Sequence, residues 1–133
     1  RPEVSNIHRL FDLLLQLLPL AGLTRPAAAA DKFAIAADGD QASAQGARLA
    51  GIAPFFHIYD DNGKLQEVLP NPHLVMEYGM GPACADTLAD MGVTVLVARK
   101  IPGPKMYDVL AFRKVRMVRR TGTVQGVVDE LKE

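Results

Sequence analysis

The sequence has no tryptophan, one cysteine and no excess of charge of either sign. Aromatic residues make up 6% of the 133 residues, so a surface that stacks on nucleic-acid bases is not expected. Lys and Arg number 15 and Asp and Glu also number 15, which gives no support for nucleic acid or an anionic membrane as the main partner. A single cysteine excludes an intramolecular disulfide, and no CxxC or HExxH pattern marks a zinc site.

The length and the hydrophobic fraction favour one folded domain. A chain of 133 residues with 49% hydrophobic residues can bury a core without disulfides. No arrangement of nucleophile and base stands out. Asp38 and Asp60 are the acids expected at strand ends, too few for metal-assisted hydrolysis. The sequence therefore predicts a protein that is not an enzyme.

The first thirty residues (1–30) predict an amphipathic helix followed by a linker. Its polar residues recur every three to four positions and would form one stripe: Ser5, His8, Arg9, Asp12 and Gln16. Such a helix would dock on a partner protein or on a second copy, giving a homodimer. The basic start and the small residues Ala28 and Ala30 also fit a secretory signal. The stretch is too interrupted to span a membrane. We expect a cytoplasmic protein, or an exported one if this segment is a signal.

Residues 31–133 predict a domain of the α/β class. Asp61-Asn62-Gly63 between two strand-like runs is the strongest hairpin signal in the chain. Strands separated by helices require right-handed crossovers and parallel pairing, whereas the hairpin adds antiparallel strands. The result is a mixed five-stranded sheet with helices on its faces. The expected strands are 32–38, 54–60, 64–70, 93–98 and 114–119, and the expected helices are 82–91, 105–112 and one capped by Thr123.

Three side chains are candidate metal ligands. His73 follows Asn-Pro in a loop and is free to turn toward a metal, although an exposed loop histidine is an equally good interpretation. Cys84 is expected in the first turn of its helix, where backbone amides would lower the pKa of the thiol. It also shares a helical face with Leu88 and Met91, as a core residue would. His57 lies between aromatic residues on a strand, which is more typical of the core.

The run Gly79-Met80-Gly81 before this helix predicts an anion-binding loop. Backbone N–H groups at a helix N-terminus are open toward negative charge. The longer G-x-G-x-x-G pattern is absent, so a dinucleotide site is not expected. Basic residues in or beside loops could add positive charge: Arg48, Arg99, Lys100 and Lys105.

Four motifs in order resemble the dinitrogenase iron–molybdenum cofactor biosynthesis family, which includes nitrogenase cofactor carriers and the orange protein of sulfate reducers. The motifs are KFAIAADGD, APFFHIYDDNGKL, GPACADTLADMGVTVLVA and VRMVRRTGTVQGVVDEL, and together they cover residues 32–132. The resemblance implies a ribonuclease H-like fold. It also implies a non-catalytic metal-binding protein that carries a metal–sulfur cluster of the iron–molybdenum or molybdenum–copper type.

One position departs from that family. Its members typically have a His-Phe-Gly-like stretch before the second strand, and that histidine is a favoured cluster ligand. Here Gly51 matches the glycine, but Leu49 stands where the histidine would be. Leucine cannot ligate a metal. The resemblance therefore implies either another ligand, with His73 the first choice, or a cofactor-less interaction module that dimerises or docks through its N-terminal helix. In the first case the cluster would lie between loop 38–51, with Arg48 and Gly51, and loop 73–84.

Overall fold

The computed structural model describes residues 30–132. The helix and linker predicted for residues 1–30 lie outside this part of the chain, except Ala30, and remain a prediction. No helix among the described residues is long and apolar enough to cross a membrane.

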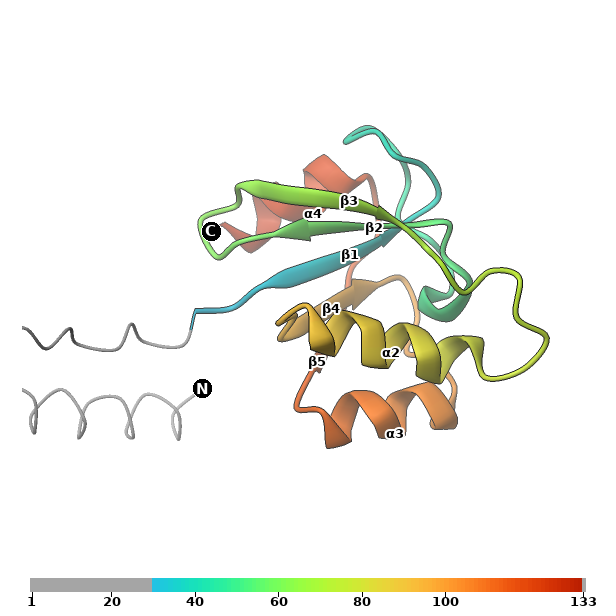
Figure 1. The fold of residues 1–133 in the computed structure, drawn as a ribbon. Helices are drawn as coiled ribbons and strands as arrows, with labels where there is room; N and C mark the ends of the chain where they lie inside the picture. Colours follow the sequence, from blue (N-terminus) through green and yellow to red (C-terminus); the bar gives the residue numbers. More distant parts are fainter. Residues whose placement is uncertain (1–29, 133) are drawn as a thin grey trace, which may run out of the picture. The chain divides into compact units, whose positions relative to one another are not determined.

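Five strands form one mixed sheet in the order β3-β2-β1-β4-β5 (Figure 1). The strands are β1 (Phe33–Ala37), β2 (Phe55–Tyr59), β3 (Leu65–Pro70), β4 (Val95–Ala98) and β5 (Arg116–Arg119). β1, β2 and β3 pair antiparallel, whereas β4 pairs parallel with β1 and with β5. The predicted α/β class and the mixed five-stranded sheet are confirmed.

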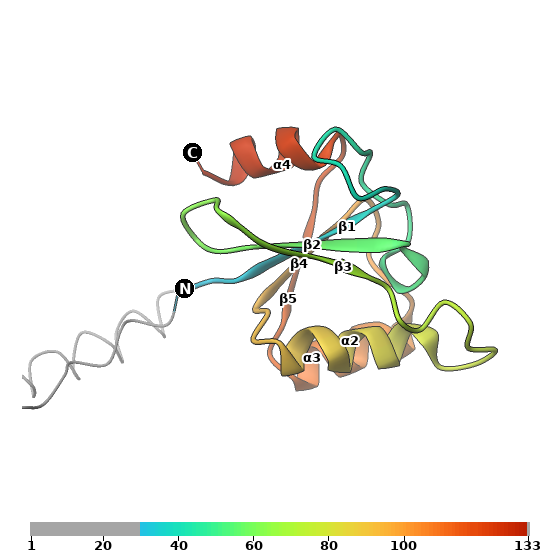
Figure 2. The same ribbon diagram turned by 45° about the horizontal axis from the view of Figure 1, so that its top comes forward.

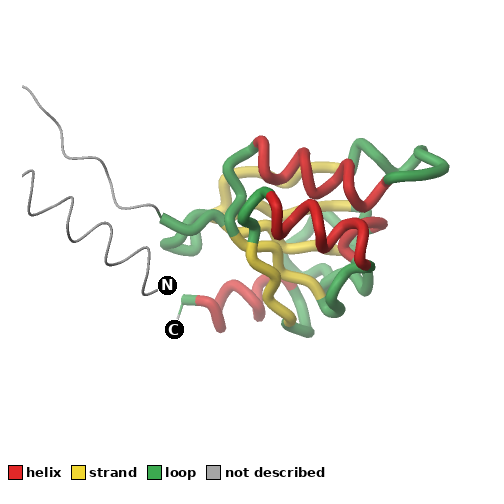
Figure 3. The backbone as a smooth tube through the Cα atoms, turned by 90° about the horizontal axis from the view of Figure 1, so that it is seen from below, coloured by secondary structure: helices red, strands yellow, loops and turns green. Residues whose placement is uncertain are grey.

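The helices cover both faces of the sheet (Figures 2 and 3). α2 (Met80–Asp90) and α3 (Pro104–Phe112) pack side by side on one face, and α4 (Val124–Leu131) packs on the other. A single 3-10 turn, η1 (Ala50–Ile52), precedes β2. The crossovers β3–α2–β4 and β4–α3–β5 thus bring the starts of α2 and α3 to the end of the sheet where β1 and β4 finish.

Alternation along β1 divides the core into two layers. Ala34 and Ala36 face α2 and α3, whereas Ile35 and Ala37 face α4. Both layers of the core consist of side chains that are almost fully buried, among them Leu88 on α2. Each such side chain stabilises the fold by roughly 1.5–3 kcal/mol relative to an exposed position.

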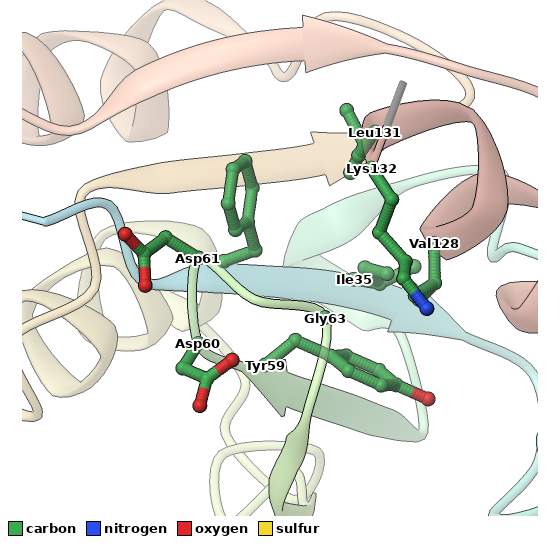
Figure 4. A pocket seen from close by; sticks show the side chains of 9 residues that line it. Ile35, Tyr59, Asp60, Asp61, Gly63, Val128, Leu131 and Lys132 are labelled. Atoms are coloured by element: carbon green, nitrogen blue, oxygen red, sulfur yellow. The ribbon is translucent and has the colours of Figure 1, made fainter.

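The predicted hairpin at Asp61-Asn62-Gly63 is confirmed. Asp60 holds the turn, because its Oδ1 accepts from the backbone N–H groups of Asn62 and Lys64, each at 2.9 Å. Gly63 has a φ of +81°, and a Cβ there would lie 2.6 Å from Lys132. Figure 4 shows Lys132 beside this turn, where a cavity of about 10 Å³, large enough for about one water molecule, separates the turn from α4.

Candidate functional site

A groove of about 390 Å³ opens where η1, the start of α2 and the start of α3 meet. Its walls are mostly apolar. They come from three short runs: 49–52, Gly81-Pro82 and 102–106. In an α/β sheet, ligands bind beyond the carboxyl ends of the parallel strands, and the loops that follow β1 and β4 lead into this groove. It is therefore the position where the fold favours a ligand.

Two helix N-termini meet at the groove, and neither is capped by a side chain. Gly79 precedes α2 with a φ of +75°, and Gly103 precedes α3, whose first residue is Pro104. Neither helix has an acidic residue in its first turn. Open N–H groups and the helix dipole favour negative charge at such ends, and Lys105 adds a cation to the lining. The groove is therefore suited to an anion with an apolar surface.

Glycines let the three segments approach closely. A Cβ on Gly51 would lie 3.1 Å from the Cα of Gly81, and a Cβ on Gly81 would lie 3.1 Å from the Cβ of Met106. Both contacts are tighter than ordinary packing allows. The absence of side chains at Gly51 and Gly81 thus lets η1, α2 and α3 pack together at the floor of the groove, with the sulfur of buried Met106 beside both glycines.

Behind the groove, Asn71 connects three parts of the chain. Its side-chain amide donates to the carbonyl of Ala53 at 2.9 Å. Its Oδ1 accepts from the backbone N–H of His73 at 2.9 Å and from the thiol of Cys84 at 3.3 Å. Asn71 is 7% exposed. The residue therefore fixes loop 71–79 against the end of η1 and against α2, and sequence reasoning missed it.

Cys84 is a buried thiol. It is 1% exposed, and burial raises its pKa, while the weaker effect of the hydrogen bond to Asn71 lowers it. The expectation that a helix N-terminus would lower this pKa is therefore wrong. The reason is burial of the thiol. In addition, α2 begins at Met80, two residues earlier than predicted, so Cys84 lies in the second turn of the helix and not in the first. The core interpretation of Cys84 agrees with its place in the α2–α3 layer.

Burial makes the fold sensitive to high pH. The pKa of Cys84 is raised above its ordinary 9.0, and burial, followed by the charge of Asp129, raises that of Tyr59 above 10.0. The folded state thus holds both protons more tightly than the unfolded chain. This contribution is complete below the ordinary values and is lost as pH rises through the raised ones. We expect the free energy of unfolding to fall above about pH 9, by at most about 1.4 kcal/mol per pH unit for each group.

Urea titrations across this alkaline range measure that slope. Cys84→Ala is the informative variant, since it removes one of the two groups. The slope just above pH 9 should become shallower in Cys84→Ala. If the two slopes are equal, burial of this thiol does not couple to folding.

The two histidines predicted as metal ligands, His57 and His73, lie in different surroundings. His57 is 1% exposed, pairs with Ile35 in the sheet and therefore faces the α4 side. Its Nε2–H donates to the carbonyl of Gly39 at 2.8 Å. His73 is half-buried, and its Nε2 shares a hydrogen bond of 2.8 Å with Oγ1 of Thr87 on α2. His57 and Cys84 thus lie on opposite faces of the sheet and do not meet.

The structure brings only part of the predicted site together. Gly51 and Gly81 line the groove, and Arg48 is exposed next to lining residue Leu49. Gly79 caps α2, whereas Met80 packs partly buried against the core. None of the candidate ligands His57, His73 and Cys84 lines the groove.

The donor set fits a bound cluster better than a chelated ion. Within residues 30–132, no three side chains of the His, Cys, Asp or Glu types come close enough to hold a metal ion together. What the groove offers is backbone amides, Lys105 and an apolar wall. These groups suit an anion that already has its own ligands.

Comparison with known proteins gives one family and several similar folds. Residues 31–133 match the family model described as dinitrogenase iron-molybdenum cofactor. The apo form of the orange protein from Desulfovibrio gigas has a TM-score of 0.69 and 23% identity, over 75% of this chain and 85% of that chain. A putative NifB protein from Thermotoga has a TM-score of 0.64 and 28% identity, over 74% and 84%. No curated protein sequence matches the chain.

Proposed function

Because the chain belongs to the dinitrogenase iron–molybdenum cofactor family, we propose that it is a non-enzymatic carrier that binds a metal–sulfur cluster in the groove between η1, α2 and α3. The cluster is cargo: it enters and leaves without chemical change. The observation that carries the proposal is the meeting of two uncapped helix N-termini at one apolar groove. The orange-protein fold supports the structural part of this argument.

Charge and shape assign the roles in binding. The open amides of α2 and α3 and the ammonium group of Lys105 would offset the negative charge of the cluster. Leu49, Ile52 and the prolines would exclude water from its sulfide surface. With fewer competing waters, each electrostatic contact gains strength. Arg48, one residue from the lining, would add long-range attraction.

The chemistry of the groove favours a cluster of soft ligands. Among the residues that line the groove, Met106 supplies a thioether, and thioethers select copper(I) and sulfide-rich centres over magnesium or calcium. We therefore propose an iron–molybdenum or molybdenum–copper sulfide cluster as the cargo. His73 would ligate only after leaving Thr87, so we assign it no contact with the bound cluster.

Reconstitution of the full chain tests this function. The protein should be mixed with tetrathiomolybdate and copper(I), and separately with an iron–molybdenum–sulfur cluster, and the charge-transfer band followed. Lys105→Glu should weaken binding about fivefold or more, since it replaces attraction by repulsion at the groove. Lys114→Glu, just beyond the other end of α3, is the matched control and should leave binding unchanged.

The same experiment can also contradict the proposal. If neither cluster binds, the carrier function is wrong. That result would favour a cofactor-less interaction module. Exposed apolar side chains near η1 and in the loop before α2 support this alternative. Ile52 is 54% exposed, and Val75 and Tyr78 in the loop before α2 are 91% and 84% exposed. In that case the protein would act by docking, and the predicted N-terminal helix would supply a second contact.

A further inference from the structure

β5 ends the sheet opposite the hairpin, and its outer side has no strand neighbour within residues 30–132. Arg116 and Arg120 donate their backbone N–H groups to Thr94 and Ala98 on the β4 side, at 2.8 and 3.0 Å. Because successive residues of a strand point their backbone groups to opposite sides, those of Met117 and Arg119 point outward. The outer side of β5 therefore offers two donors and the carbonyl of Met117 to an added strand, while the carbonyl of Arg119 already accepts from the guanidinium group of Arg120 at 2.7 Å.

The two edges of the sheet differ in how they are protected. β3 ends at Pro70, and its pairing with β2 is irregular at Ile58 and Tyr59, both of which discourage another strand from pairing. β5 pairs with β4 in unbroken register and has no proline. Its protection is charge: Arg116, Arg119 and Arg120 follow one another within five residues. A second copy would bring arginines against arginines, so self-pairing at this edge is disfavoured.

The side chains of β5 determine which residues an added strand would need on each of its two faces. Met117 packs on the α2–α3 layer, where a hollow of about 500 Å³ separates β5 from α3, with Tyr107 and Leu110 in its wall. Arg120 lies toward α4, where it contacts Glu130 at 3.5 Å. Alternation places Arg116 on the same side of the strand as Arg120, and its guanidinium group pairs with Asp31 at 3.1 Å. An added strand would meet a hollow beside α3 that is apolar at Leu110 and Met117 and basic at Lys114, and it would meet Arg120 on the other face.

A second hollow continues this basic face at the end of β5. It measures about 370 Å³, and its charged lining consists of Arg99, Arg119 and Arg120 against the single acid Glu130. The guanidinium group of Arg119 has no hydrogen-bond or ion-pair partner in the described part of the chain. Excess positive charge here favours carboxylates of a partner.

We propose that the β5 edge binds an extended acidic segment of a partner protein, in which acidic and apolar residues alternate, by strand addition to the sheet. The N–H groups of Met117 and Arg119 and the carbonyl of Met117 pair with the segment, its apolar side chains enter the hollow beside α3, and its carboxylates meet Arg119 and Arg120 at the end of the strand. The inference does not depend on the cargo, because the β5 edge and the groove share no lining residue.

A designed peptide tests the proposal on the full chain. The probe is a fluorescein-labelled peptide of alternating glutamate and valine, about eight residues long, which is an ordinary strand length. It should bind with fluorescence anisotropy that falls as salt rises. On saturation, amide hydrogen exchange at Met117 and Arg119 should slow about tenfold or more, because both N–H groups become hydrogen-bonded.

Three controls separate strand addition from simple attraction. A peptide methylated on the amides that face β5 keeps its charge and should bind about tenfold more weakly. Arg120→Glu should weaken the unmodified peptide about tenfold or more, whereas Lys64→Glu, beside the other edge strand, should not. Equal binding of the methylated peptide, unaffected binding to Arg120→Glu, or unchanged exchange at Met117 would each overturn the proposal.

Discussion

Replacing Asn71 with alanine should lower the free energy of unfolding by about 3 kcal/mol, since three hydrogen bonds of a buried side chain are lost and each contributes about 1 kcal/mol. The loss also leaves the carbonyl of Ala53, the N–H of His73 and the thiol of Cys84 without that partner. An effect of this size is a large part of the total stability of a small domain. Urea denaturation at neutral pH measures it directly.

Asn62→Ala provides the matched control. Asn62 lies exposed in the β2–β3 turn, where its backbone N–H, not its side chain, makes the hydrogen bond to Asp60. The control should change stability by less than about 0.5 kcal/mol, as exposed substitutions usually do. If Asn71→Ala were as mild as this, the three contacts would not be what fixes loop 71–79.

Leu49→His should strengthen cluster binding by about tenfold to a hundredfold, the range by which groups that support a metal site change affinity. Leu49 is 40% exposed and lines the groove, so an imidazole there would face the cargo without disturbing the core. Imidazole is a good ligand for copper and iron. The change would convert capture by charge and shape into capture with a coordinate bond. Titration with the same clusters, read by absorbance, gives the affinity ratio.

Leu65→His is the comparison variant for that experiment. Leu65 has a similar exposure of 46% but lies on β3, away from the groove. Only a gain in Leu49→His that exceeds the gain in Leu65→His counts as ligation in the groove. Equal gains in both variants would mean that any surface histidine binds the metal, and the groove would then not be the binding site of the cluster.

The fold was predictable because the turn residues and the hydrophobic pattern along the chain indicated the same strands and helices. The Asn-Gly turn, the short apolar run of β1 and the spacing of strands and helices gave the correct sheet. The site was only partly predictable, since it depends on which turns meet in space. The sequence analysis predicted Gly51 and Gly81, from separate loops, as cofactor-binding residues. It did not predict the second helix N-terminus, at Gly103. Its Pro-Gly-Pro signal resembles the Gly-Pro signal before α2 and could have been used.

Other features could not be read from the sequence. Asn71 gains its role from contacts with residues 18 positions before it and 13 positions after it. The start of α2 was misplaced because Gly-Met-Gly-Pro reads as a loop, whereas Gly79 alone takes the left-handed conformation that precedes the helix. Proline is tolerated within the first turn of a helix, where its missing N–H would have no partner. Burial of Cys84 in the α2–α3 layer, and not the position of the helix start, reverses the expected direction of its pKa.

Burial of the single cysteine also has a redox meaning. The thiolate is the form that attacks disulfides and reacts with oxidants. Cys84 is held as a thiol at neutral pH and is 1% exposed, so it offers no thiolate ligand to the metals of the proposed cluster. It is equally unavailable for a disulfide between two chains. If the proposed function holds, such a protein would load and release its cluster without exchanging sulfur or electrons through its own cysteine.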